Sequence, residues 1–260
     1  MTLDTLSAVA FGPDPGCWPL PAATTHRQRW LRAVAAGGQG RYASAHAELA
    51  MLRRTVPAGP LASLALSTTA SLWRQLGWHT RARGYDGRAL LLAGEDTEAA
   101  ADALVGLAAD ALGVGRFAAS AALLARADRL PTPSAARQPV RRAWVGAELA
   151  MATGDGAEAI RLARRAQELV ANTDLARHRV KSDLVAAAAL CTAGRVDAAR
   201  RAADTALAAA EELGLMPLRW AAGCLLDGIG SGSRAARQVV DLRDDAAERI
   251  RQRGGVWRNP

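Results

Sequence analysis

The side chains that most often bind metals or carry out catalysis are few in this sequence and lie far apart. The histidines and cysteines are His26, His46, His79, His178, Cys17, Cys191 and Cys224. None of them have the close spacing of a zinc site, and an odd number of distant cysteines does not form a disulfide framework. The sequence therefore predicts no metal, no cofactor and a reducing compartment.

The one lysine, Lys181, restricts the enzyme classes that the chain could belong to. A phosphate-binding P-loop needs a Gly-Lys pair, which is absent, and a Schiff-base enzyme would have to use Lys181. We interpret Lys181 as an exposed residue of a charged helical stretch. The segment Gly230-Ser231-Gly232-Ser233 resembles a phosphate loop, but no lysine follows it and no strand precedes it. We interpret it as a flexible turn, and we expect no enzymatic activity.

The positive charge of the chain is spread along its length. Lys and Arg number 33 and Asp and Glu 25, which gives a net charge of +8. Residues 1–130 contain 13 basic and 10 acidic side chains, and residues 131–260 contain 20 and 15. An even surplus promotes solubility and weak attraction to polyanions, but it does not define a nucleic-acid face. We therefore expect no specific nucleic-acid partner.

Targeting signals and membrane segments are not evident in the sequence. The first ten residues contain Asp4 and no basic residue, so they do not resemble a signal peptide. The densest apolar run, residues 184–193, is too short to cross a bilayer. We expect a cytoplasmic protein that has no membrane partner.

The composition predicts an all-α fold. Half of the residues are hydrophobic, yet only 4% are aromatic, and alanine and leucine are the main apolar types. Alanine and leucine favour helices, whereas the β-branched and aromatic residues that fit a pleated sheet are sparse.

Evenly spaced glycines indicate an internal repeat. They are Gly40, Gly77, Gly115, Gly154, Gly194 and Gly230, and the interval between successive members is nearly constant. A small residue follows each glycine five positions later. Twelve positions after the glycines stand Leu52, Ala89, Ala127, Ala166, Ala206 and Leu242. Glycine adopts the left-handed conformation that ends a helix, and small residues allow two helices to approach closely.

Each repeat is therefore predicted to be a pair of antiparallel helices joined by a short turn. The predicted pairs are 25–36 and 41–54, 61–76 and 79–92, 96–112 and 116–129, 135–152 and 157–171, 174–192 and 196–213, and 217–229 and 233–253. One such pair cannot bury its own apolar stripe, but a stack of pairs can.

The pattern resembles that of tetratricopeptide-repeat proteins, in a divergent form like the helical-repeat regions of bacterial regulators and adaptors. Trp73 and Leu76 before Gly77 match the aromatic and leucine of that family's first helix, and alanines twelve residues after four of the glycines match its second helix. The period exceeds the family's 34 residues. The resemblance implies a right-handed α-solenoid of about six antiparallel helix hairpins over residues 25–253. Residues 1–24 would form an irregular arm, and residues 254–260 a tail.

In the family that this sequence resembles, the first helix of each hairpin lines a concave groove. The matching groove positions lie six and three residues before each glycine and one and four residues after it. They hold Arg41, Arg74, Trp78, Arg81, Arg116, Glu148, Met151, Asp155, Glu158 and Arg195. The N-terminal half of the groove would be cationic, with an acidic step in the fourth repeat. The alternative is that these arginines merely cover the surface of an arginine-rich chain.

The resemblance implies a non-enzymatic scaffold or adaptor that binds peptide segments, in particular acidic ones, in its groove. Arginines can hold carboxylates through charge-assisted, bidentate hydrogen bonds. A regulatory or signal-sensing module that acts on the transcription machinery is the alternative. A third reading is an enzyme with an unrecognised site in the groove.

Overall fold

The computed structural model describes residues 2–131 and 137–258. Within these residues every regular element is a helix, which confirms the all-α part of the prediction. The helices are α1 (Thr2–Phe11), α2 (His26–Gly38), α3 (Tyr42–Thr55), α4 (Pro60–Gln75), α5 (His79–Leu92), α6 (Thr97–Gly113), α7 (Phe117–Asp128), α8 (Arg137–Ala152), α9 (Gly156–Ala171), α10 (Ala176–Thr192), α11 (Val196–Glu212), α12 (Met216–Ile229) and α13 (Ala236–Gln252). The start predicted for the helix at 135–152 lies outside the described residues.

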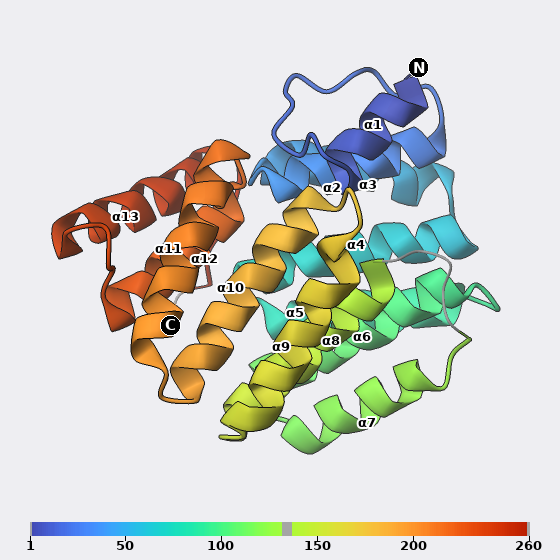
Figure 1. The fold of residues 1–260 in the computed structure, drawn as a ribbon. Coiled ribbons are helices and arrows are strands. Elements are labelled where there is room, and N and C mark those ends of the chain that lie inside the picture. The colour runs from blue at the N-terminus through green and yellow to red at the C-terminus, as the bar shows by residue number, and fades with distance from the viewer. Residues whose placement is uncertain (1, 132–136, 259–260) are drawn as a thin grey trace.

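Helices that follow one another in the chain pack against one another (Figure 1). After α1, the closest packing joins α2 to α3, α4 to α5, α6 to α7, α8 to α9, α10 to α11, and α12 to α13. The second helix of each pair also contacts the first helix of the next pair. We call α2, α4, α6, α8, α10 and α12 the first helices.

The repeated glycines end the first helices as the sequence predicts. Gly40 and Gly77 have φ angles of +73° and +88°, and the glycines at 115, 154 and 194 share this conformation. The residue after each of these five glycines donates its backbone N–H to a carbonyl five residues earlier, as in the 2.8 Å bond from Arg41 to Ala36. This hydrogen bond defines a Schellman cap, which a residue with a Cβ would strain.

The small residues of the repeat lie where neighbouring helices touch. Ala82, Ala159 and Ala199, five residues after their glycines, are fully buried. Ala166 and Ala206, twelve residues after theirs, are 0% and 1% exposed. The second helices therefore approach their neighbours through alanine side chains.

We expect Ala166→Leu and Ala206→Leu each to lower the free energy of unfolding by about 1–3 kcal/mol, because the added atoms overpack a helix contact. Arg201→Ala, on the exposed face of α11, should change it by less than about 0.5 kcal/mol. Chemical denaturation measures all three. Equal, small effects at the three positions would contradict this packing.

The sixth turn differs from the prediction. The helix after Gly230 begins at Ala236, because Asp204 binds the intervening loop through Ser231 Oγ at 2.6 Å and the Gly232 N–H at 2.8 Å. The buried positions move four residues along the chain to Val239 and Ala246. The expected contact residues Ala235 and Leu242 are exposed and half-buried, respectively.

The sequence predicted an irregular N-terminal arm, but part of this segment is helical. Residues 2–11 form α1, which packs on α2 and α10. Leu6, Val9 and Ala10 are buried in the largest core cluster. Leu6 and Val9 are three residues apart and Ala10 follows directly, so the three side chains form a short apolar stripe on one face of a helix. The Pro- and Gly-rich residues 12–21 that follow led to the prediction of an irregular arm.

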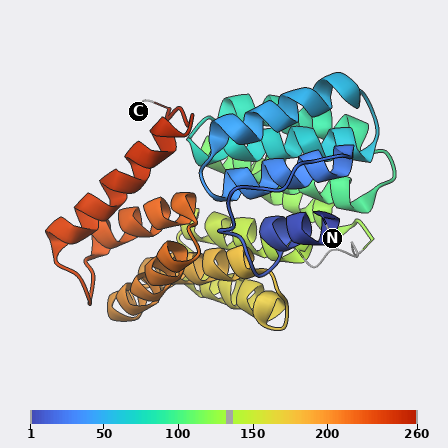
Figure 2. The ribbon, with the colours of Figure 1, turned by 90° about the horizontal axis from the view of Figure 1, so that it is seen from above.

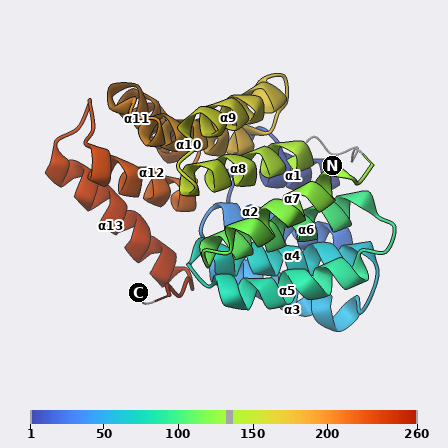
Figure 3. The same cartoon turned by 90° about the horizontal axis from the view of Figure 1, so that it is seen from below.

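The last helix pair returns to the first. The Ala43 N–H donates to Arg253 O at 2.9 Å, and Arg253 donates to Gln39 O at 3.0 Å. The Arg258 N–H donates to Leu76 O at 2.9 Å. Figures 2 and 3 show the C-terminal end of α13 beside the helices of the first pairs. The two ends of the helix array are therefore in contact.

Candidate functional site

A cavity of about 690 Å³ lies among the first helices. Its size falls in the range of small-molecule pockets, about 300–1,000 Å³. Each first helix contributes to its wall, and so do Phe11 of α1 and Trp257 near the C-terminus. One lining residue from each first helix is Val34, Leu72, Val105, Trp144, Lys181 and Leu218.

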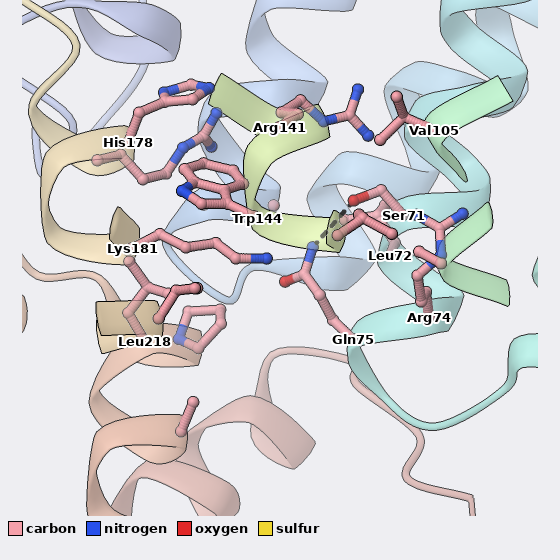
Figure 4. Close-up of a pocket in the computed structure, with 18 of the residues that line it drawn as sticks. Ser71, Leu72, Arg74, Gln75, Val105, Arg141, Trp144, His178, Lys181 and Leu218 are labelled. Atoms are coloured by element: carbon pink, nitrogen blue, oxygen red, sulfur yellow. Dashed lines mark hydrogen bonds between the residues drawn. The ribbon is translucent and has the colours of Figure 1, made fainter. Parts of the chain in front are cut away.

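The helical repeat positions these side chains. On α8 the lining residues are Arg137, Arg141, Trp144, Val145, Glu148 and Met151, and on α10 they include Arg177, His178, Lys181, Leu184, Val185 and Ala188. Steps of three and four residues keep side chains on one face of a helix. Figure 4 shows side chains of α8 and α10 facing Ser71, Leu72 and Gln75 of α4 across the cavity.

Arg74 of α4 is held by two buried carboxylates. Its Nε lies 2.7 Å from Asp110 Oδ1, and its Nη2 contacts Asp86. Burial, reinforced by Asp110, raises the pKa of Asp86 to about 7, although Arg74 opposes the shift. Arg74 therefore belongs to a structural ion network that joins α4, α5 and α6.

The arginines of α8 form a second network with α6. Arg137 Nη2 lies 2.6 Å from Glu98 and 2.7 Å from Asp102, and Arg141 also contacts Asp102. Burial, together with the positive charge of Arg74, lowers the pKa of Arg141 to about 10. These two cations have carboxylate partners.

The cations of α10 are less fully paired. Arg177 donates to the backbone oxygens of Val34 at 3.0 Å and Ala10 at 3.1 Å, and among the described residues it has no salt bridge. Burial, with Arg137 and Arg141 nearby, lowers its pKa to about 10. Lys181, expected to be exposed, is partly exposed and also lies on the cavity wall, 4.7 Å from the Trp144 ring and 3.6 Å from Glu148.

His178 is buried between the aromatic and cationic side chains of this wall. Its ring stacks on Trp144 with centroids 5.3 Å apart, and its Nδ1 has no hydrogen-bond partner in the described part of the chain. Burial holds the pKa of His178 well below its usual range, and Arg177, Arg137, Arg141 and Lys181 lower it further. The imidazole is therefore neutral near pH 7.

We expect the wild-type protein to lose stability relative to His178→Phe as the pH falls below 6.5. Unfolded histidine takes up a proton there, whereas folded His178 does not, so acid favours the unfolded state. The difference should grow by up to about 1.4 kcal/mol per pH unit and stay constant between pH 7 and 8. Urea denaturation at several pH values measures it, and a difference independent of pH would contradict this assignment.

The predicted groove residues separate into two groups. Arg74, Glu148 and Met151 line the cavity. Trp78 lies near it, where its Nε1 donates to Val256 O at 2.7 Å. Arg81 stacks on the Trp73 ring at 3.6 Å, and the structure brings it to the outer surface beside that ring.

The remaining predicted residues lie at the turns, away from the cavity lining. Arg116, Asp155 and Arg195 are exposed N-cap residues of α7, α9 and α11. Arg41, the N-cap of α3, stacks on the Trp18 ring at 3.9 Å, and Glu158 pairs with Arg161. A residue directly after a turn glycine begins the second helix, so its side chain lies at the edge of the array.

The charge order of the cavity also differs from the expected one. The N-terminal half of the array was expected to supply the cations, but of these it contributes only Arg74 to the described lining, and buried carboxylates balance the charge of Arg74. Most of the cations that line the cavity come from α8 and α10. The sequence carries a signal for them. Arg137 and Arg177 precede their turn glycines by the same interval, and Arg141 and Lys181 share a second, shorter interval. Equivalent positions of two successive repeats therefore hold cations.

The fold and the cavity define an all-helical protein of consecutively packed helix pairs around a largely apolar pocket with cationic side chains on one wall. Searches against protein-family models, curated proteins and solved structures found no match. Among the described residues, no helix has the length and apolar character needed to span a membrane. The same residues contain no group of three or more His, Cys, Asp or Glu side chains placed to hold a metal.

Proposed function

We propose that this chain is a non-enzymatic scaffold or adaptor that holds a peptide segment in the central cavity. The proposal rests chiefly on the convergence of one face of every first helix on that cavity. It includes a tetratricopeptide-like arrangement, a right-handed α-solenoid of six antiparallel hairpins, with which the consecutive helix pairs are compatible. The family resemblance implies the same role for the first helices.

A signal-sensing module is the second candidate, and the contact between the chain ends favours it. A ligand in the cavity would touch α2 and α12 as well as Trp257. It would therefore bridge the first and last helix pairs. Ligand binding could then change the closure of the array, which is the kind of two-state element that a sensor needs.

A cavity-filling substitution tests the binding site. Ala188 of α10 lines the cavity, and Ala208 of α11 is exposed on the outer surface. We expect the wild-type protein and Ala208→Trp to capture the same members of an immobilised library of acidic octapeptides. Ala188→Trp should bind them at least about tenfold more weakly, because the indole occupies the site. Capture that is equal in all three proteins would exclude the cavity as the peptide site.

A further inference from the structure

Equivalent positions of three successive first helices form layers of charge. Two positions, each at a constant interval before the turn glycine, hold Glu98 and Asp102 in α6, Arg137 and Arg141 in α8, and Arg177 and Lys181 in α10. The acidic layer of α6 pairs with the cations of α8 through the salt bridges described above. The next pair of cations, Arg177 and Lys181 on α10, comes after a pair on α8 that already has carboxylate partners.

The two cations of α10, Arg177 and Lys181, carry more positive charge than the nearby carboxylates neutralise. Within residues 2–131 and 137–258, Arg177 has only backbone oxygens as acceptors, and Glu148 is the one carboxylate paired with Lys181, at 3.6 Å. On the other side of the layer, α12 presents Pro217, Leu218 and Ala221 to the cavity. These apolar residues supply no counter-charge.

A buried polar atom without a partner lies in the same wall. His178, which is 4% exposed and lines the cavity, has no hydrogen-bond partner at Nδ1 among the residues that the structure describes. Buried polar groups are nearly always hydrogen-bonded, so an unsatisfied one is unusual. This Nδ1 atom has essentially no accessible surface, so a bound group would meet the charged neighbours of His178 rather than Nδ1 itself.

Apolar side chains continue the cavity from this wall. Leu218 of α12 lines the same cavity as Lys181, and both are labelled in Figure 4. Leu184, Trp220 and Trp257 also line the cavity, and the Trp220 and Trp257 rings are 4.4 Å apart. The cavity thus combines a cationic wall with aromatic and aliphatic surface. This combination suits a ligand that has one charged part and one apolar part.

We propose that the cavity binds an amphipathic anion, whose negative group is held by Arg177 and Lys181 and whose apolar body packs against Leu218, Trp220 and Trp257. This inference rests on the proposed function, because it names the ligand chemistry of the same site. The anion supplies the charge that the α10 cations lack, and charge-assisted hydrogen bonds from arginine and lysine are stronger than those between neutral groups. A free organic acid and an acidic side chain in an apolar peptide share this chemistry.

Isothermal titration calorimetry of the full-length protein tests the charge requirement with defined probes. Decanoate represents the free acid, and 1-decanol is its neutral match. N-acetyl-Leu-Asp-Leu-amide represents the peptide, and its Asn analogue is the neutral match. We expect at least one anionic probe to bind about tenfold or more tightly than its neutral match. Whichever pair shows the difference identifies the source of the anion.

Substitutions assign the charge selectivity to α10. We expect Lys181→Met to weaken binding of the anionic probe about tenfold while leaving its neutral match within about twofold. Arg201→Met, on the exposed face of α11, should change neither affinity. Lys181 is the residue of choice because Arg177 also ties α10 to α1 and α2, so its replacement would affect folding.

The outcomes separate this inference from the proposed function. If the anionic and neutral probes bind equally and Ala188→Trp abolishes both, the cavity remains a binding site and the anion inference is wrong. The inference is equally wrong if Lys181→Met leaves the selectivity unchanged. Binding of no probe, or binding that Ala188→Trp does not weaken, contradicts the cavity as the site of either ligand.

Discussion

Replacing Arg74 by methionine should lower the free energy of unfolding by about 3–5 kcal/mol, the usual cost of removing one partner from a buried ion network. Asp86 and Asp110 are fully buried, and Arg74 contacts both of them. Without the guanidinium, two carboxylates remain close together in a region of low polarity. Denaturation by urea, followed by circular dichroism, measures the loss.

A triple variant distinguishes the network from simple packing. Arg74→Met combined with Asp86→Leu and Asp110→Leu removes the three charges of Arg74 and its two carboxylates together, so it should recover most of the lost stability. His79 and Arg141 lose a nearby carboxylate in this variant, so the recovery should be incomplete. If the triple variant is less stable than Arg74→Met alone, the network contributes more than charge compensation, and the expected cost is wrongly assigned.

The loss caused by Arg74→Met should be larger at pH 8 than at pH 6. Burial and Asp110 already raise the pKa of Asp86 to about 7, and removal of the opposing cation raises it further. A folded-state pKa above the unfolded value means that stability falls as the pH rises toward the folded pKa. In the variant this fall continues above pH 7, whereas in the wild type it ends near pH 7. A loss that is the same at both pH values would contradict this titration.

This network changes the role of a residue that sequence reasoning assigned to ligand binding. Arg74 lines the cavity, as expected, but its charge is used within the protein. A charge reversal at Arg74 would therefore disrupt the fold and could not report on binding. Its partners, Asp86 and Asp110, are 12 and 36 residues away in the sequence, and nothing local in the sequence indicates that they meet.

The helix pairs themselves were predictable because their signals are local. A glycine that ends a helix and an alanine that allows close approach act within one repeat, so composition and spacing suffice to locate them. Gly230 shows the limit of this reasoning. It has a φ of +82° and ends α12, but a loop held by Asp204 delays the next helix, and this contact joins different repeats.

The cavity was predictable only in part, because the first helices were identified but not the face that each turns inward. That face depends on how successive pairs rotate relative to one another. Residues next to the turn glycines, such as Arg116 and Arg195, occupy the N-cap positions of the second helices at the edge of the array. Residues earlier in the first helices, such as Arg177, lie on the cavity wall. Comparing equivalent positions between repeats would have revealed the charge layers.

The closure of the array had no signal in the sequence, and Gly254 is the residue that allows it. Gly254 has a φ of +88°, and a Cβ there would lie 2.6 Å from the Ala43 Cβ and 2.9 Å from the Ala43 nitrogen. That nitrogen donates the hydrogen bond to Arg253 O. A side chain at position 254 therefore both strains the turn and separates the chain end from α3.

We expect Gly254→Val to lower the free energy of unfolding by about 2–4 kcal/mol, through left-handed backbone strain and loss of the closing contacts. Gly115→Val is the matched control, since Gly115 has a φ of +75° but no atom within 4 Å of an added Cβ. Gly115→Val should introduce only the backbone strain and lower the free energy of unfolding by about 1–2 kcal/mol. Gly254→Val should also shift tryptophan emission to longer wavelength, because Trp257 leaves Trp220. Equal costs and unchanged emission would mean that the chain end does not close the array in solution.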